Sequence, residues 1–333
     1  MNSPTRYCVL GGSGSFGIHT ALYLLGQSEN NSVIGIGRNP IRARPEAFNL
    51  GIEKHPRFSY YEHHVTYELD SLLQTLDREQ PEIIVNFAAQ GEGAVSWQQS
   101  WRFFETNCVG LTRLAEALGK RPWLRRFIQI GTSEMYGSVD VPAKEADPIK
   151  PTSPYAVSKV AFDMHLMSTR DRSNLKFNII RPSNCYCPGQ LLHRVIPKAI
   201  WCGLKGMKLP LQGGGVVRKS YLHARDLARA IQVVACASPH GKIFNVGPDS
   251  PSSIREVVER CADAMGIPFD QLCGEVAGRQ GEDSQYWLDS TEIKKLGWRQ
   301  TIFWEEGLKE MVEWGNKYRS TLVDWPAGYT LRA

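Results

Sequence analysis

The sequence predicts an α/β protein with a doubly wound parallel sheet, followed by a smaller C-terminal α/β domain. From Arg6 to Arg181, short apolar strands alternate with amphipathic helices, a rhythm typical of parallel sheets with right-handed crossovers. Beyond Arg181, frequent prolines and glycines replace this rhythm. We therefore expect a first domain from residues 1–182 plus about 216–248, and a second from residues 183–215 and 249–333.

The expected elements follow from the spacing of apolar residues along the chain. Short, mostly apolar runs predict buried strands, whereas apolar residues three or four apart predict helices. The expected strands span residues 6–10, 32–37, 82–87, 127–131 and 176–181, and a segment within 221–246 is expected to extend the same sheet. The expected helices span residues 18–25, 67–78, 103–118, 153–169, 253–264 and 304–318.

A glycine-rich turn joins the first expected strand to the first helix. Gly11, Gly14 and Gly17 lie in this turn, together with Ser15 and Phe16. Glycines placed between a strand and a helix let the backbone approach a pyrophosphate at the helix N-terminus. The turn is therefore predicted to bind a dinucleotide cofactor.

The second expected strand bears on the choice between NAD and NADP. An acidic residue at its end usually accepts the ribose hydroxyls of NAD, but this chain has Arg38 there, with Arg42 and Arg44 beyond. An arginine can pair with a 2′-phosphate through two hydrogen bonds, which favours NADP; alternatively, Arg38 stacks on the adenine or faces solvent. The expected cofactor site comprises Gly11, Gly14, Ser15, Phe16, Gly17, Arg38, Ala88, Ala89 and Gln90, with Tyr155 and Lys159.

Tyr155 and Lys159 are the strongest sign of chemistry. Four residues apart on a helix, they share one face, so that the ammonium can lower the pKa of the phenol. Such a pair can take a proton from a substrate hydroxyl while its carbon gives a hydride to a nicotinamide. The run Thr132-Ser-Glu134 comes directly after the expected strand 127–131 and adds a second base. The sequence therefore predicts an oxidation and then a further step.

Composition and charge narrow the class of partner. The 333 residues are 42% hydrophobic and 22% charged, and the formal net charge is +5, which is ordinary for a globular protein. There is no basic run with interleaved aromatics, so we expect no nucleic-acid partner. No stretch approaches the length of a membrane span, and the first strand begins too early for a signal peptide. We expect a cytoplasmic protein without a membrane partner, whose mild positive charge suits an anionic small molecule.

The eight cysteines are scattered, and only Cys185 and Cys187 are close in sequence. A tetrahedral metal site needs a second such pair or a histidine cluster, and the sequence has neither. We therefore expect reduced thiols and no metal.

Taken in order, these residues resemble the extended short-chain dehydrogenase/reductase family, the nucleotide-sugar epimerases and dehydratases, over nearly the whole chain. The shared marks are Gly11/Gly14/Gly17, Asn86-Phe-Ala-Ala-Gln90, Thr106-Asn107, Thr132-Ser-Glu134, Tyr155/Lys159, Arg181-Pro-Ser-Asn184, Arg218 ahead of Asp226, Asn245-Val-Gly247, the run from Gly278 to Tyr286, and Leu296-Gly-Trp298. The later marks and the Ser153-Pro-Tyr155 context look most like the 4,6-dehydratases. The resemblance implies a Rossmann fold, a tightly bound NAD(P)+ and a homodimer.

The resemblance also implies a reaction on a sugar nucleotide. Tyr155 would take the C4 hydroxyl proton as hydride leaves C4, and Thr132 would hydrogen-bond the same oxygen. Glu134 would then remove the C5 proton, water would leave from C6, and the hydride would return to C6. The implied catalytic residues are Thr132, Ser133, Glu134, Tyr155 and Lys159, and the implied substrate-binding residues are Ser96, Asn184, Arg218, Arg279 and Tyr286.

The chain departs from this pattern in its expected sugar pocket. In dTDP-glucose 4,6-dehydratases an aspartate usually occupies the position of Ser133 and protonates the leaving hydroxyl, which a serine cannot do directly. Many relatives carry a histidine after Ala88-Ala89, where this chain has Gln90-Gly-Glu-Gly93. The alternatives are a UDP-glucuronate-type decarboxylase or a 4-epimerase on the same fold or, in a different class, a non-catalytic NAD(P)-binding regulator.

Overall fold

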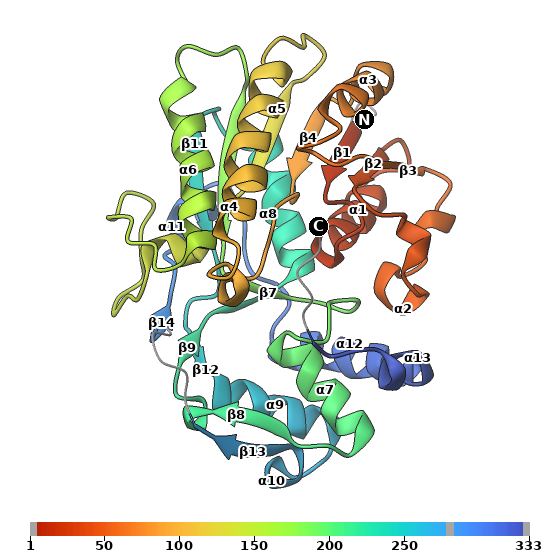
Figure 1. Ribbon diagram of the computed structural model, residues 1–333, viewed down its shortest axis with the longest axis vertical. Helices are drawn as coiled ribbons and strands as arrows, with labels where there is room; N and C mark the ends of the chain where they lie inside the picture. The colour runs from red at the N-terminus through yellow and green to blue at the C-terminus, as the bar shows by residue number, and fades with distance from the viewer. Residues whose placement is uncertain (1–4, 278–282, 329–333) are drawn as a thin grey trace.

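Seven parallel strands form the central sheet, in the order β11-β6-β5-β4-β1-β2-β3 (Figure 1). The strands of this sheet are β1 (Arg6–Leu10), β2 (Ser32–Gly37), β3 (Phe58–Glu62), β4 (Ile83–Asn86), β5 (Arg126–Ile130), β6 (Phe177–Pro182) and β11 (Lys242–Val246). The computed structural model describes residues 5–277 and 283–328. The strand order confirms the predicted doubly wound α/β fold, and it changes direction between β1 and β4, where such sheets bind ligands.

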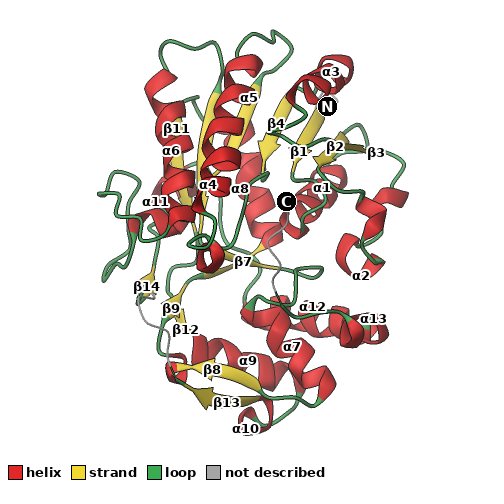
Figure 2. Cartoon of the chain, in the orientation of Figure 1, coloured by secondary structure: helices red, strands yellow, loops and turns green. Residues whose placement is uncertain are grey.

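Helices cover both faces of this sheet (Figure 2). The helices are α1 (Ser15–Gly26), α2 (Glu46–Asn49), α3 (Leu69–Glu79), α4 (Ser100–Phe104), α5 (Leu111–Leu118), α6 (Pro154–Thr169), α7 (Val195–Lys205), α8 (Ala224–Ala237), α9 (Ile254–Met265), α10 (Phe269–Leu272), α11 (Thr291–Lys295), α12 (Trp304–Lys317) and α13 (Arg319–Asp324). α1 and α8 pack against one face, and α3, α5 and α6 against the other. The sheet is therefore the middle layer of three.

Side chains of β1 show how the sheet is buried from both sides. Tyr7 and Val9 pack with α1 and α8, whereas Cys8 and Leu10 pack with α3, α5 and α6. All four are buried. A strand covered on both faces is apolar along its whole length, which is why unbroken apolar runs predicted these strands.

The five expected strands match the observed ones to within one residue at each end. β3 had no expected range; it lies at the edge of the sheet and is only partly buried, so its sequence lacks a continuous apolar run. The helix expected at residues 103–118 starts earlier, with α4, and is interrupted by a π-helical turn, η4 (Glu105–Gly110). Other short turns are η1 (Ile41–Ala43), η2 (Ile52–Lys54), η3 (Gly93–Val95), η5 (Ser133–Tyr136) and η6 (Gly213–Gly215).

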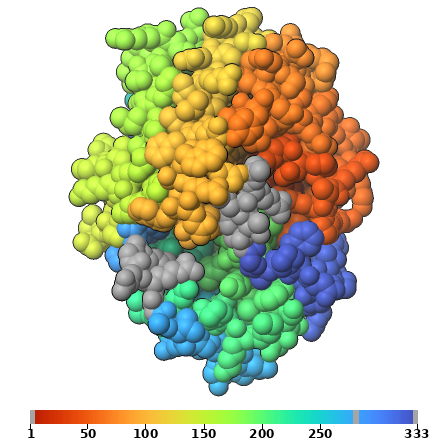
Figure 3. Space-filling model, in the orientation of Figure 1, coloured from red at the N-terminus to blue at the C-terminus, as the bar shows by residue number. Residues whose placement is uncertain are grey.

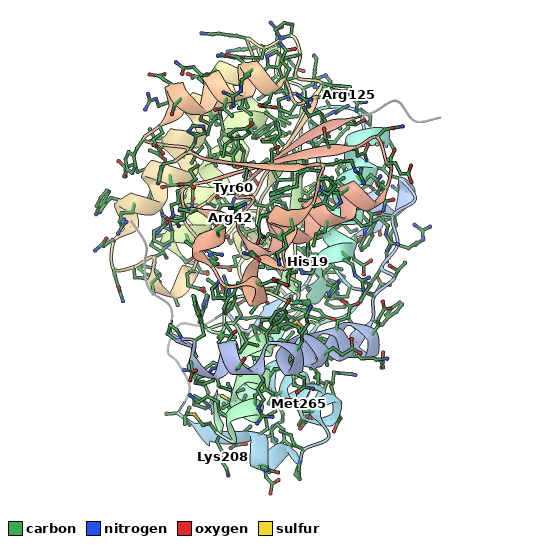
Figure 4. All side chains as sticks on the ribbon, turned by 90° about the vertical axis from the view of Figure 1, so that its right-hand side faces the viewer. His19, Arg42, Tyr60, Arg125, Lys208 and Met265 are labelled. Carbon is green, nitrogen blue, oxygen red and sulfur yellow. The ribbon has the colours of Figure 1, made fainter. Side chains whose placement is uncertain are left out.

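A second group of elements packs around its own core, formed mainly by α7, α9 and α12. Figure 4 shows Lys208 and Met265 in this group, and Tyr60 and Arg125 in the part that contains the large sheet. Its short strands are β7 (Asn184–Tyr186), β8 (Leu209–Gln212), β9 (Arg218–Lys219), β10 (Tyr221–His223), β12 (Ser252–Ser253), β13 (Cys273–Val276) and β14 (Gln285–Tyr286). Within segment 221–246, β10 pairs with β7 and α8 follows it, whereas β11 joins the large sheet beside β6.

None of the described helices is both long enough and apolar enough to cross a membrane. Within residues 5–277 and 283–328, no three histidine, cysteine or acidic side chains gather in a way that could hold a metal ion. All eight cysteines are free.

Candidate active site

Three adjoining cavities run along the carboxyl ends of the strands. The main cavity has a volume of about 500 Å³, the middle cavity about 330 Å³ and the outer cavity about 200 Å³. Phe87 and Ala89 line all three, so the cavities form one continuous path. The main cavity brings together Thr132, Ser133, Glu134, Tyr155, Lys159 and Asn184, and the middle cavity brings together Gly11, Gly14, Ser15, Phe16, Gly17, Arg38, Ala89 and Gln90.

The glycine-rich turn before α1 is packed too closely for side chains. Gly11 has a φ of +79°, and a Cβ there would lie 3.0 Å from the backbone nitrogen of Ala88. A Cβ on Gly17 would lie 2.5 Å from the carbonyl oxygen of Gly11. Gly14 caps α1 without a side chain, which leaves the first N–H groups of the helix facing the middle cavity. The turn therefore fits a pyrophosphate.

The outer cavity is cationic where β2 ends. Arg38, Arg44, His64 and Ala88 are among the residues that line it. The Arg44 guanidinium donates a hydrogen bond of 3.0 Å to the carbonyl of Ser13. None of the described residues that line this cavity is acidic. The chemistry of this wall suits an anionic group more than bare ribose hydroxyls.

Tyr155 and Lys159 lie on the first two turns of α6, whose N-terminus is capped by Ser153. Lys159 Nζ donates a hydrogen bond of 2.6 Å to the carbonyl of Ile130. Burial lowers the pKa of Lys159 to about 8, while Asp163 opposes this shift.

The pKa of Tyr155 is raised, which is opposite to the direction expected from its lysine neighbour. Burial is the first cause and the nearby Glu134 carboxylate the second; Arg194 and a hydrogen bond with Thr132 act against them. A phenolate at Tyr155 therefore needs further positive charge in the site.

Glu134 lies in the turn η5, directly after β5, and faces the main cavity. Its backbone N–H donates a hydrogen bond of 3.2 Å to the hydroxyl of Thr132. Burial raises the pKa of Glu134, against the opposing charges of Lys219 and Arg194. A Cβ on Gly93 would lie 3.1 Å from Glu134 Oε2, so the loop after β4 passes close to the carboxylate. A buried carboxylate with a raised pKa is suited to act as a general base.

A buried polar network holds the turn that carries Glu134. Arg181 Nε lies 3.4 Å from Asp163 Oδ2, and both side chains are almost inaccessible to solvent. Arg181 also donates a hydrogen bond of 2.8 Å to the Tyr136 hydroxyl, which donates to Asn245 Oδ1 at 2.9 Å. The network links η5 to α6, β6 and β11. It gives a structural role to Arg181 and Asn245, which the sequence alone showed only as marks of the family resemblance.

Asn107 fastens the loop after β4 to the catalytic helix. It lies in the π-helical turn η4, and its amide donates to the Gln90 carbonyl at 2.9 Å and to the Ser158 hydroxyl at 3.0 Å. In return, the Gln90 N–H donates to Asn107 Oδ1 at 2.7 Å. A π-helical turn often marks a functional position. This turn places the Asn107 amide between the loop after β4 and the helix α6.

Three predicted substrate-binding residues, Ser96, Arg218 and Tyr286, are not among the described residues that line the main cavity. Ser96 is fully buried and donates a hydrogen bond of 2.6 Å to the Gly93 carbonyl. Arg218 donates to the Pro251 carbonyl at 2.8 Å, and Tyr286 donates to Asp283 at 2.6 Å. Arg279 lies outside the described residues. Of this set, Asn184 alone is among the described residues that line the main cavity.

Sequence reasoning missed several residues that line the cavities. Lys219 follows Arg218 on β9, and successive side chains of a strand point to opposite sides; Lys219 is the one in the main cavity. Glu92, His193 and Arg194 line both the main and the middle cavity. Trp325 lines the middle cavity and packs against Phe48 of α2 at 4.7 Å between ring centroids. No motif spacing points to these residues, because distant segments bring them together.

Glu92 adopts a backbone conformation that is rare for a glutamate. Its φ is +81°, which costs on the order of 1–3 kcal/mol for a residue other than glycine. The ion pairs of its side chain with His193 and Arg194, at 2.5 and 3.2 Å, hold it there. The loop after β4 is thus tied to the segment before α7.

The model of the NAD-dependent epimerase/dehydratase family matches residues 7–247. The chain belongs to this family. The matched range contains the glycine-rich turn, Glu134, and the Tyr155 and Lys159 pair. Membership of the family therefore agrees with a nicotinamide cofactor at the middle and outer cavities.

Individual relatives include 4,6-dehydratases, as the resemblance implied, and also a 4-epimerase of the same fold. A trifunctional UDP-glucose 4,6-dehydratase/UDP-4-keto-6-deoxy-D-glucose 3,5-epimerase/UDP-4-keto-L-rhamnose-reductase of Arabidopsis thaliana is 29% identical over 94% of this chain. The chain spans 47% of the length of that protein. The structure of dTDP-glucose 4,6-dehydratase from Bacillus anthracis in complex with NAD is 28% identical, with a TM-score of 0.85 over 95% of this chain and 98% of that one. UDP-glucose 4-epimerase from Thermotoga maritima, solved with UDP-glucose, is 25% identical, with a TM-score of 0.83 over 96% and 100% of the two chains.

Proposed function

We propose that the protein is a nucleotide-sugar 4,6-dehydratase that produces a 4-keto-6-deoxy sugar nucleotide. The observation that carries the proposal is the position of Glu134, whose carboxylate faces the same cavity as Tyr155 and Lys159. Of the side chains in this cavity, only the Tyr155 and Lys159 pair is needed for a bound nicotinamide to oxidise a sugar hydroxyl. Loss of water from the neighbouring carbons needs a second base, and Glu134 is placed to be that base.

The residues of the main cavity divide the proposed reaction among them. Tyr155 accepts the C4 hydroxyl proton, and Thr132, within hydrogen-bonding reach of Tyr155, orients the same oxygen. Lys159, held by its hydrogen bond to the Ile130 carbonyl, supplies positive charge near Tyr155, which lies four residues earlier on the same helix. Glu134 removes the C5 proton, which the C4 ketone has made acidic, and later returns a proton to C5.

The cofactor fits the middle and outer cavities, where the turn Gly11–Gly17 and Arg38 would hold it. When bound, the oxidised nicotinamide supplies hydride storage and the positive charge that favours a phenolate at Tyr155. Because hydride is stored and returned within one turnover, the cofactor is expected to stay bound.

We further propose that NADP+ is preferred over NAD+. The support is the pair Arg38 and Arg44 in the outer cavity, together with His64. Guanidinium groups recognise phosphate in a fixed planar geometry, and acidic side chains, which would favour free ribose hydroxyls, are absent from the described lining. The relative from Bacillus anthracis was solved with NAD, so a preference for NADP+ would distinguish this chain from that relative.

The proposal also includes the domain division and a homodimer. Residues 1–182 and about 216–248 would hold the cofactor, and residues 183–215 and 249–333 the sugar nucleotide. The homodimer is supported by exposed apolar side chains on and beside α4 and α6: Trp97, Trp101, Phe104, Val157 and Met164. The segment that contains α4 lies on the face turned toward the viewer in Figure 3. An apolar surface of this kind favours an isologous interface. The eight free cysteines suit the reducing cytoplasm.

A panel of sugar nucleotides tests the proposed activity. Purified protein is incubated with dTDP-, UDP-, CDP- and GDP-hexoses and UDP-N-acetylglucosamine in deuterated water, without added cofactor, and the products are read by mass spectrometry. A dehydratase removes water from one substrate and introduces one deuteron at C5. Loss of carbon dioxide from a uronic acid, or no mass change with any donor, would contradict the proposal.

A further inference from the structure

Glu92, His193 and Arg194 form a charged cluster in the wall shared by the main and middle cavities. The Glu92 and His193 side chains are each only 14% exposed, and their nearest charged atoms are 2.5 Å apart. Arg194 reaches the same carboxylate oxygen at 3.2 Å. The cluster joins the loop after β4 to the segment before α7. His193 is thus a partly buried, paired histidine that lines the same cavity as Glu134 and has an acid–base capacity that the steps described above do not use.

The proposed reaction needs an acid that the residues assigned so far do not supply. The C6 hydroxyl leaves as water only if it receives a proton. Tyr155 and Lys159 serve the C4 oxygen, and Glu134 accepts the C5 proton. Ser133 is too weak an acid, because its hydroxyl holds its proton throughout the working pH range.

Glu92 is held ionised and so cannot be that acid itself. Burial opposes its ionisation, but His193, Arg194 and Lys219 outweigh burial and keep the pKa of Glu92 below its usual range. Lys198 and Lys219 also line the main cavity, but an ammonium holds its proton more tightly than an imidazolium does and is the poorer general acid near neutral pH.

We propose that His193 donates the proton to the leaving C6 hydroxyl, and that Glu92 holds the imidazolium in the orientation to do so. This proposal rests on the proposed dehydratase function. His193 lines the same cavity as Glu134 and Tyr155, and imidazole is the side chain whose proton affinity best matches neutral pH. The Glu92 carboxylate, paired with one side of the His193 ring, fixes the orientation of that ring.

The proton balance of the step closes. Glu134 removes the C5 proton as the bond between C6 and oxygen breaks, and the imidazolium proton joins the departing hydroxide to form water. The stored hydride then returns to C6, and Glu134 gives its proton back to C5. After release of product, Tyr155 holds one proton more and His193 one fewer than at the start. Solvent in the open cavity returns that proton between turnovers.

The test compares His193→Ala with the unmodified enzyme at separate stages of the reaction. We expect the variant to oxidise C4 normally, so that absorbance of reduced nicotinamide accumulates, while water loss falls by about 10²-fold to 10³-fold. An analogue with fluorine in place of the C6 hydroxyl should restore elimination to a rate close to that of the unmodified enzyme, because fluoride leaves without a proton. Glu92→Gln should show a smaller loss of the same kind.

Accumulated reduced cofactor in His193→Ala also shows that the variant is folded and binds substrate. His240→Ala is the matched control, since His240 lies between α8 and β11 at the amino ends of the strands, away from the cavities. If His193→Ala loses water at the normal rate, or if the fluorinated analogue fails to restore elimination, the assignment is overturned while the dehydratase function stands. If the unmodified enzyme removes water from no sugar nucleotide, both fall together.

Discussion

The two halves of the active site are built differently. The oxidation half, with Tyr155 and Lys159, stands on the helix α6, whose Asp163 forms a buried ion pair with Arg181 of β6. The elimination half, with Glu92 and His193, consists of two loop segments joined by an ion pair at the surface of the cavities. The first half is the part that oxidation of a sugar hydroxyl by the nicotinamide requires. Under the proposed function, the second half, together with Glu134, determines the fate of the oxidised sugar.

This difference locates the distinctive chemistry of the chain. The backbone geometry of a helix or strand sets the direction of a side chain on it, so the position of that side chain depends little on contacts with other segments. A side chain on a loop depends on partners from other segments, as the left-handed backbone of Glu92 does on His193 and Arg194. We therefore expect substitutions in the two halves to stop the reaction at different stages and to differ in their cost to stability.

Tyr155→Phe should have the largest effect and stop the reaction before any cofactor is reduced. The variant lacks the group that accepts the C4 proton, so kcat should fall by about 10⁴-fold. Stopped-flow absorbance should show no reduced nicotinamide, in contrast to His193→Ala. Tyr67→Phe is the control, because Tyr67 is exposed. If reduced cofactor appears in Tyr155→Phe, then the two variants do not stop at different stages, and the proposed division between oxidation and elimination is wrong.

Asp163→Ala should show that the oxidation half depends on its buried network. The change leaves the Arg181 guanidinium buried without its carboxylate, which costs about 3–5 kcal/mol in the free energy of unfolding. Urea denaturation measures this loss. The control Asp171→Ala removes an exposed pair with Arg170 at 2.8 Å and should cost less than about 1 kcal/mol. Equal losses in the two variants would argue against a special role for the network.

Lys159→Met should change how stability depends on pH. The pKa of Lys159 is lowered to about 8 in the folded protein, whereas an unfolded lysine has a pKa of about 10.4. Between these values the unfolded chain binds more protons, so the free energy of unfolding rises with pH, by about 3 kcal/mol from this group. Cofactor-free wild type should show the rise and Lys159→Met should lack it in chemical denaturation. Parallel curves would contradict the burial of a charged Lys159.

Arg38→Ala should have the smallest effect of these variants. It should weaken cofactor binding and leave both the oxidation and the loss of water unchanged once the cofactor is bound. Loss of one guanidinium from the outer cavity is expected to weaken NADP+ binding by about tenfold, roughly the strength of a charge-assisted hydrogen bond. NAD+ affinity should stay nearly unchanged in isothermal titration calorimetry. Arg42→Ala is the matched control, since Arg42 is exposed and is not among the described residues that line the outer cavity. An equal loss for both cofactors would contradict the NADP+ preference.

The oxidation half could be predicted from sequence because its signals are local. The strand ending before Thr132, and the four-residue spacing of Tyr155 and Lys159, place these groups without knowledge of the rest of the chain. The spacing predicted a lowered pKa for Tyr155 next to Lys159. The pKa of Tyr155 is raised instead, because burial and the Glu134 carboxylate both raise it. Burial is a property of the whole fold and cannot be read from spacing.

The elimination half could not be predicted, because its contacts join residues that lie far apart in the sequence. Glu92 and His193 meet only after the sheet and the segment before α7 are in place. On β9, the family resemblance implied Arg218 as a substrate-binding residue, but successive side chains of a strand point to opposite sides, and Lys219 is the one that lines the main cavity. Asn107 and Arg181 were recognised as marks of a family, and only the structure explains them as supports of the cofactor loop and of the turn that carries Glu134.

The central claim is that hydride leaves C4, that water is lost, and that the same hydride returns to C6. The most direct measurement uses the accepted sugar nucleotide with deuterium at C4 and locates the label in the product by NMR. The account predicts that the deuterium appears in the C6 methyl group, with no exchange into solvent. Deuterium retained at C4 would indicate epimerisation, and deuterium released to free cofactor would indicate a simple dehydrogenase; either result would contradict the account.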